Sequence, residues 1–136
     1  MFEVNLVSVV AVSVLNMLIG MVWFSPALFG HAWLKFMGKN KKEMKKMGKL
    51  ANGAYPWAFF GMLVMSACLA VFVKMAGVST IPEGAVIGLI AWLGFVATTS
   101  MNSVLWENES KELYLFNNAH VLFTLMVSGA ILATWA

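Results

Sequence analysis

Four long apolar stretches, separated by short polar links, constrain this chain more than any other feature. They cover about residues 4–24, 55–73, 84–106 and 113–135, and none of them contains an Asp, Glu, Lys or Arg. About 20 helical residues cross a hydrocarbon core about 30 Å thick. A helix also satisfies its own backbone polar groups, which lipid cannot do. The sequence therefore predicts an all-α integral membrane bundle of four transmembrane helices, forming a single domain over residues 1–136.

The amounts of polar and charged surface agree with this class. The chain is 61% hydrophobic and only 11% charged, whereas a soluble domain carries about 25% charged residues. All nine basic residues are lysines, and seven of them lie between Lys35 and Lys49. Without arginine the chain lacks the bidentate contacts typical of specific nucleic-acid readers. We therefore expect the lipid bilayer, and no nucleic acid, as a partner.

The first apolar stretch ends in a segment that carries the signs of a membrane–water boundary. Tryptophan favours the headgroup level, and Ser25 before Pro26 is a good start for a helix. We expect one helix to end near residue 24 and a short interfacial helix to begin at Pro26. The alternative is a single helix kinked at that proline. The positions that define this interfacial signature are Trp23, Ser25, Pro26, Phe29, Gly30 and Trp33.

This segment, W-F-S-P-x-L-F-G-x-x-W, resembles the W-[FY]-S-P-x-L-F-G-x-x-W signature of an uncharacterised bacterial family of small four-helix integral membrane proteins, known only as a domain of unknown function. The resemblance continues through residues 94–97, 102–107, 111–118 and 129–132. Family members commonly have Tyr in place of Phe24 and basic residues in place of Asn108 and Glu109. The resemblance implies a four-helix membrane fold and brings no activity, cofactor or established site.

The lysine-rich segment comes next and predicts the orientation of the chain. Asn40 with Glu43 fits the start of a helix, so we expect a short basic helix separate from the second span, which begins near Tyr55 with Pro56 in its first turn. Lys39–Lys49 either binds anionic lipid or forms a solvated loop. In both cases the positive-inside rule predicts a cytoplasmic Lys35–Lys49 loop and outside termini, in a bacterial inner membrane.

Small and polar positions within the stretches predict how the helices pack. Gly84, Gly88 and Ala91 form a face on which another helix can approach closely. This face favours self-association or membership of a larger membrane complex. Asn16 is costly to expose to lipid, so we expect it to face another helix. We expect Cys68 to be a small buried residue.

Polar residues also mark one end of the predicted bundle. The ends of the first and third spans and the start of the fourth lie on the same side, so their polar groups are expected to gather there. These groups either cap and pair with one another, or line a vestibule that binds a small solute or a headgroup. The predicted polar cluster comprises His31, Asn102, Glu107, Asn117, Asn118 and His120.

The residues that most enzymes and metal sites require are scarce. The chain has no Asp, and its two histidines and one cysteine cannot supply the ligands of a zinc site. We expect no catalytic residues, no metal and no cofactor, and hence no enzyme. The spans lack the intramembrane charge of most ion carriers and show no sign of a broken helix at the midplane. The sequence favours a non-enzymatic membrane subunit, with a carrier or binding protein for a small neutral or amphipathic solute or lipid headgroup as the alternative.

Overall fold

The computed structural model contains helices joined by short links, and no strands, over the residues that it describes, 4–23 and 41–135, with the backbone alone for residues 41–52. Four helical segments are long and apolar enough to cross a membrane, as the sequence predicts: Leu6–Trp23, Gly53–Ala76, Ile81–Trp106 and Lys111–Thr134. The predicted fold class is therefore confirmed. The interfacial helix predicted from Pro26 lies outside the described residues.

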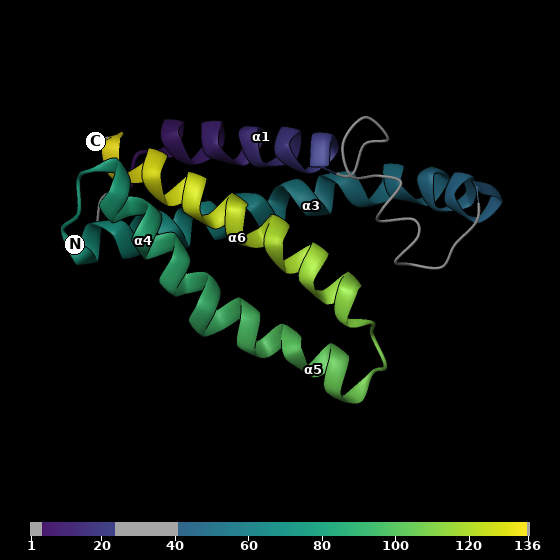
Figure 1. The fold of residues 1–136 in the computed structure, drawn as a ribbon. Coiled ribbons are helices and arrows are strands. Elements are labelled where there is room, and N and C mark those ends of the chain that lie inside the picture. The colour runs from purple at the N-terminus through teal and green to yellow at the C-terminus, as the bar shows by residue number, and fades with distance from the viewer. Residues whose placement is uncertain (1–3, 24–40, 136) are drawn as a thin grey trace.

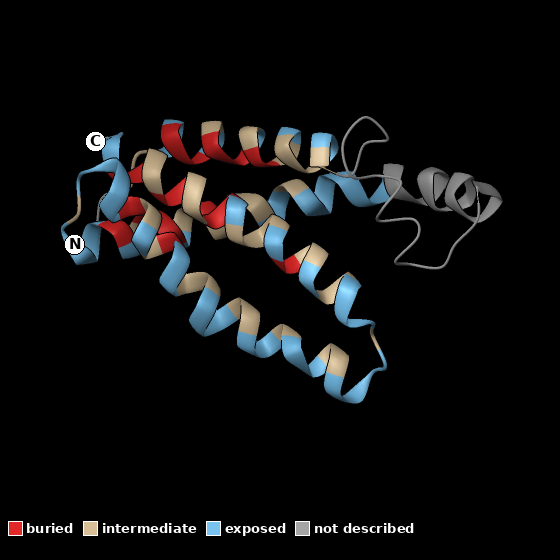
Figure 2. Ribbon diagram, in the orientation of Figure 1, coloured by how far each residue is buried: buried red, intermediate tan, exposed pale blue. Residues whose placement is uncertain are grey.

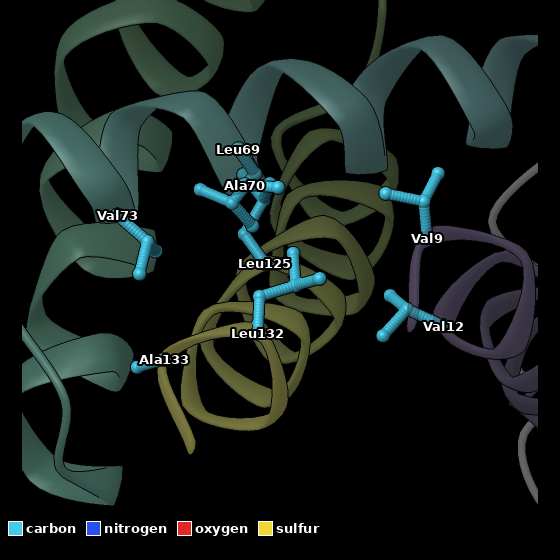
Figure 3. Packing of buried hydrophobic residues seen from close by; sticks show 8 residues of the cluster. All are labelled: Val9, Val12, Leu69, Ala70, Val73, Leu125, Leu132 and Ala133. Carbon is cyan, nitrogen blue, oxygen red and sulfur yellow. The ribbon is translucent and has the colours of Figure 1, made fainter. Parts of the chain in front are cut away.

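Successive spans alternate in direction (Figure 1). Helix α1 (Leu6–Trp23) lies beside α3 (Lys41–Ala76), and α6 (Lys111–Thr134) packs against both. The third span is divided into α4 (Ile81–Ala91), η1 (Trp92–Ala97) and α5 (Thr98–Trp106). Buried positions gather where α1, α3, α4 and α6 meet, and α5 is largely exposed (Figure 2). Figure 3 shows the buried apolar core: Val9, Val12, Leu69, Ala70, Val73, Leu125, Leu132 and Ala133.

The basic segment is helical, but it is not a separate helix. Helix α3 runs without interruption from Lys41 to Ala76, with Pro56 inside it. Proline removes one backbone hydrogen bond, a loss that neighbouring groups in membrane helices make up, and the lysines, methionines and alanines before it are good helix formers. The expectation that Pro56 opens a new helix was wrong. At 1.5 Å per residue the 36 residues span about 54 Å, so α3 extends well beyond a hydrocarbon core of about 30 Å.

Helices α4 and α6 make the most extensive contact between described elements, and glycines allow it. A Cβ atom added at Gly84 would lie 2.2 Å from the Gly129 carbonyl oxygen, and one added at Gly88 would lie 2.2 Å from the Leu125 carbonyl oxygen. Both glycines are buried. The backbones therefore approach as closely as small-residue motifs permit, and the partner of the predicted glycine face is a helix of the same chain.

The third span is interrupted by a π-helical segment that the sequence did not predict. Residues Trp92–Ala97 form η1 near the middle of the span. Three of its carbonyl groups accept hydrogen bonds from hydroxyl side chains that follow in the sequence. Thr98 donates to the Gly94 carbonyl, Thr99 to the Phe95 carbonyl and Ser100 to the Val96 carbonyl. Serine and threonine can satisfy backbone groups that a distorted membrane helix leaves free. This role accounts for the three hydroxyl side chains at the start of α5, and the π-helical segment corrects the expectation of a regular helix through the midplane.

A tight turn connects the third span to the fourth. Asn108 adopts a left-handed backbone conformation with φ of 57°, which asparagine tolerates better than most residues. The Glu109 N–H bonds the Ser103 carbonyl, and the Ser103 hydroxyl bonds the Glu109 carboxylate. Ser110 then caps α6 by accepting a hydrogen bond from the Leu113 N–H. The turn thereby fixes where α6 begins.

Candidate functional site

A layer of buried polar side chains joins three helices in the middle of the bundle. The Ser128 hydroxyl of α6 donates to Asn16 Oδ1 of α1 over 3.1 Å. The Ser13 hydroxyl of α1 lies 3.3 Å from the Ser66 hydroxyl of α3 and 2.7 Å from the Val9 carbonyl. All four residues are fully buried. The prediction that Asn16 faces another helix is therefore confirmed, and the layer aligns α1 with both of its neighbours.

A second polar group lies where α6 and the third span begin to separate. The Trp92 indole N–H donates to the Asn118 carbonyl over 2.9 Å, and the Tyr114 hydroxyl donates to the Ala97 carbonyl over 2.6 Å. Each bond has one partner in η1: Trp92 is the donor of the first, and Ala97 is the acceptor of the second. Asn118 Nδ2 donates to the Tyr114 carbonyl over 2.8 Å, while its buried Oδ1 has no hydrogen-bond partner among the described residues. This group couples α6 to the distorted segment and holds a buried acceptor oxygen.

An aromatic cluster closes the other side of α6. The Trp23 ring lies 5.5 Å from the His120 ring, 6.0 Å from Phe116 and 6.3 Å from Phe123, measured between centroids. A Cβ atom added at Gly20 would lie 3.7 Å from His120 Nε2, so this glycine leaves room for the imidazole. Trp23 therefore packs against α6 at the end of α1, in addition to any role at the headgroup level.

The structure separates the predicted polar cluster into parts. Asn118 is buried, and Asn117 and His120 are half-buried on α6. Asn102 is exposed and donates to the Thr99 carbonyl of its own helix, and Glu107 is exposed at the end of α5. Within the described part of the chain, the hydrogen bonds do not connect Asn102 or Glu107 with Asn118. His31 lies outside the described residues, as do the signature positions Ser25, Pro26, Phe29, Gly30 and Trp33.

Among the described residues, two apolar grooves lie on the outside of the bundle, and Ala91 lines one of them. The first, termed here the α1–α6 groove, has a volume of about 370 Å³ and is lined by Leu15, Leu18, Ile19, Val22, Trp23 and Phe123. The second, of about 400 Å³, lies between α3 and the third span. Ala91 lines this second groove, so it does not share the position of Gly84 and Gly88 against Gly129 and Leu125.

Comparison with known families gives a match over most of the chain. The family model described as "Protein of unknown function (DUF1761)" matches residues 7–133. The match covers nearly all of the four described spans. The chain belongs to the DUF1761 family. No curated protein and no solved structure matches it.

Membership of the DUF1761 family identifies no catalytic residue, because the family is described only as being of unknown function. Among the described residues, no group of three or more His, Cys, Asp or Glu side chains could hold a metal ion. The one cysteine, Cys68, is exposed on α3. The expectation that it is buried was wrong because the buried face of α3 is formed by Ser66, Leu69, Ala70 and Val73.

Several residues that organise this DUF1761 protein were not predicted from its sequence. Trp92 and Tyr114 bridge η1 and α6, and Ser66 and Ser128 complete the central polar layer. The sequence did contain a signal for the serines, because each lies on the same helix face as other small residues. Ser128 lies four residues after Thr124, and Ser66 lies four residues before Ala70. No comparable signal distinguishes Trp92 from the other tryptophans.

Proposed function

We propose that this protein is a non-enzymatic membrane subunit that acts by packing its helices against a second copy or against partner proteins in the bilayer. The observation that carries the proposal is the shape of the third span. Its first half is fixed against α6 by Gly84 and Gly88, whereas α5 diverges from the bundle (Figure 1). Only 17% of its most apolar window is buried, the smallest share of the four spans.

The surface of α5 suits association with another helix. Leu105 and Trp106 are 59% and 80% exposed, and the hydroxyls of Thr98, Thr99 and Ser100 are engaged with their own backbone. Asn102 likewise donates to its own helix, so a partner helix would meet exposed apolar side chains and polar groups that are already bonded within α5. Association of membrane helices depends largely on such side-chain packing. The internal polar bonds meanwhile keep the other helices in place, so α5 can engage a partner without rearranging the core.

We further place the protein in a bacterial inner membrane, with the Lys35–Lys49 loop in the cytoplasm and both termini outside. The charge of this loop supports the orientation, since short lysine-rich loops are retained on the cytoplasmic side. The arrangement of the helices supports it as well, because the start of α1 and the end of α6 lie at the same end of the bundle, opposite the lysine-rich start of α3 (Figure 1).

Cysteine cross-linking in membranes tests the subunit proposal. In a C68S background, we compare L105C on α5 with the control L6C on α1, where Leu6 is 74% exposed and Leu105 is 59% exposed. After treatment with a bifunctional thiol reagent, L105C should give a discrete product and L6C should not. Reconstitution of the purified protein distinguishes the partners, because a product of twice the chain mass then identifies a second copy. Equal cross-linking of both variants, or none in native and reconstituted membranes, would contradict the proposal.

A second candidate function is binding of a small neutral or amphipathic solute, and the buried Asn118 Oδ1 specifically favours it. This oxygen has no hydrogen-bond partner among the described residues, although its residue is only 6% exposed. A buried acceptor without a donor is costly, and a solute hydroxyl or amide N–H would satisfy it. Mild solubilisation followed by mass spectrometry should then recover a small molecule that N118L loses and N102A retains. Recovery of no molecule from the wild type would dismiss this candidate.

A further inference from the structure

Two buried polar atoms beside the central polar layer have no hydrogen-bond partner among the described residues. One is Asn16 Nδ2 on α1, and the other is Thr124 Oγ1 on α6. Asn16 is 0% exposed and Thr124 is 1% exposed, so bulk solvent does not reach either atom. Burial of such groups without partners destabilises a fold. Each of the two atoms therefore requires a partner inside the bundle.

The hydroxyl of Thr124 is not bonded to its own helix. Serine and threonine in membrane helices often donate to a carbonyl three or four residues earlier. Thr134 of α6 does so to the Ala130 carbonyl over 3.1 Å, and Ser13 of α1 does so to the Val9 carbonyl over 2.7 Å. Thr124 makes no such bond, so its oxygen is available to a group outside α6.

Thr124 lies on the face of α6 that α1 covers. Residues four apart on a helix share a face, and Thr124 is four residues from both Ser128 and His120. Ser128 donates to Asn16, and His120 Nε2 would lie 3.7 Å from a Cβ atom added at Gly20. Thr124 therefore lies between these two contacts and faces the turn of α1 that runs from Asn16 to Gly20.

The two atoms are complementary, but they are not bonded to each other. Polar groups that face each other beyond direct bonding distance are commonly bridged by water. Gly20 leaves room at this turn, because a Cβ atom added there would approach other parts of the described chain no closer than 3.7 Å. A buried water molecule needs only a small polar space and makes about two to four hydrogen bonds. A cation does not fit the same atoms, because it would face the hydrogens of the Asn16 amide.

We propose that one water molecule is bound between α1 and α6, where it accepts a hydrogen bond from Asn16 Nδ2 and donates one to Thr124 Oγ1. Because Ser128 already donates to Asn16 Oδ1, the water completes the bonding of the Asn16 amide at both of its ends. It also extends the central polar layer along α6 by one turn. This inference depends neither on the subunit proposal nor on a solute at Asn118.

Solid-state NMR of the full chain in lipid bilayers detects such a water directly. Magnetisation is transferred from water protons to the side-chain amides of isotope-labelled asparagine. We expect a water cross-peak at the Asn16 amide, although this amide is fully buried. T124V removes one of the two partners of the water and should reduce the cross-peak about fivefold. T134V is the matched control, the same change at an exposed position of α6, and should leave the cross-peak unchanged.

The sign of the stability change gives a second readout. If nothing bonds the Thr124 hydroxyl, T124V removes an unsatisfied group and lowers the equilibrium constant of unfolding. With the water bound, T124V breaks a bridge between two helices and should raise that constant about fivefold, whereas T134V should change it by less than about twofold.

Three results would overturn the inference: no water cross-peak at Asn16 in the wild type, a cross-peak that T124V does not reduce, or a T124V protein more stable than the wild type. A destabilised T124V protein without a water cross-peak in the wild type would indicate a direct bond between Asn16 and Thr124 in place of the water. If T124V does not fold, the wild-type cross-peak decides.

Discussion

Replacement of Gly88 by alanine should destabilise the bundle more than its small size suggests. The new Cβ would lie 2.2 Å from the Leu125 carbonyl oxygen, 2.6 Å from the Leu125 carbonyl carbon and 2.9 Å from the Met126 Cα. All three are backbone atoms, so no side-chain rotation relieves the clash. Reaching an ordinary contact of 3.4 Å requires α4 and α6 to separate by about 1.2 Å at their crossing.

The expected cost follows from two opposing effects. Overpacking of a close contact costs about 1–3 kcal/mol, and a rigid obstacle places this change near the upper end. Alanine in place of glycine in a helix returns about 0.5–1 kcal/mol. We therefore expect a net loss of about 2 kcal/mol in the free energy of unfolding, measured by circular dichroism during titration with sodium dodecyl sulfate in mixed micelles.

Gly61→Ala provides the matched control for this prediction. Gly61 lies inside α3, and a Cβ atom added there would meet nothing within 4 Å. This variant should be as stable as the wild type or more stable by about 0.5–1 kcal/mol. If Gly88→Ala unfolds at the same detergent fraction as Gly61→Ala, the inferred backbone contact between α4 and α6 does not limit the stability of the bundle.

Three further predictions concern the polar contacts and the orientation. A double-mutant cycle with N16A and S128A should give a coupling energy of about 0.6–1.7 kcal/mol, and additive effects would show that the pair contributes nothing. Y114F should lower the free energy of unfolding by about 1 kcal/mol and speed amide hydrogen exchange in α5 but not in α1. Equal protection of α5 in Y114F and the wild type would refute the bond from Tyr114 to the Ala97 carbonyl. A reporter active only in the cytoplasm and fused after Ala136 should stay silent, and a strong signal would reverse the orientation.

The positions of the membrane helices could be predicted from the sequence because lipid imposes simple rules. A helix must be long enough to cross the hydrocarbon core and must avoid charge. These rules placed all four spans, and the cost of burying an amide correctly predicted that Asn16 faces another helix. They operate within single segments, so they require no knowledge of which helix lies beside which.

The parts that were missed depend on contacts between segments. The Gly84 and Gly88 face could be recognised as a packing surface, but the pattern itself does not tell whether α6 or a second copy covers it. The π-helical segment has no sequence signature, because it is stabilised partly by hydrogen bonds with α6. Trp92 donates to the Asn118 carbonyl of α6, and Tyr114 of α6 donates to the Ala97 carbonyl. Similarly, the predicted polar cluster was assigned to one end of the bundle by topology alone. Topology sets the level of Asn102 in the membrane but does not decide that its side chain bonds to its own helix.

The bond between Asn16 and Ser128 has a consequence for the biosynthesis of the protein. The two residues are 112 positions apart, and at 5–20 residues per second the ribosome needs roughly 6–22 s to pass from one to the other. During this interval α1 has already been made, but the hydroxyl that donates to Asn16 Oδ1 has not. A side-chain carbonyl oxygen without a donor is costly in lipid, so α1 gains its full set of polar contacts only when α6 has been inserted. Helix α6, made long after α1, therefore completes the environment of Asn16.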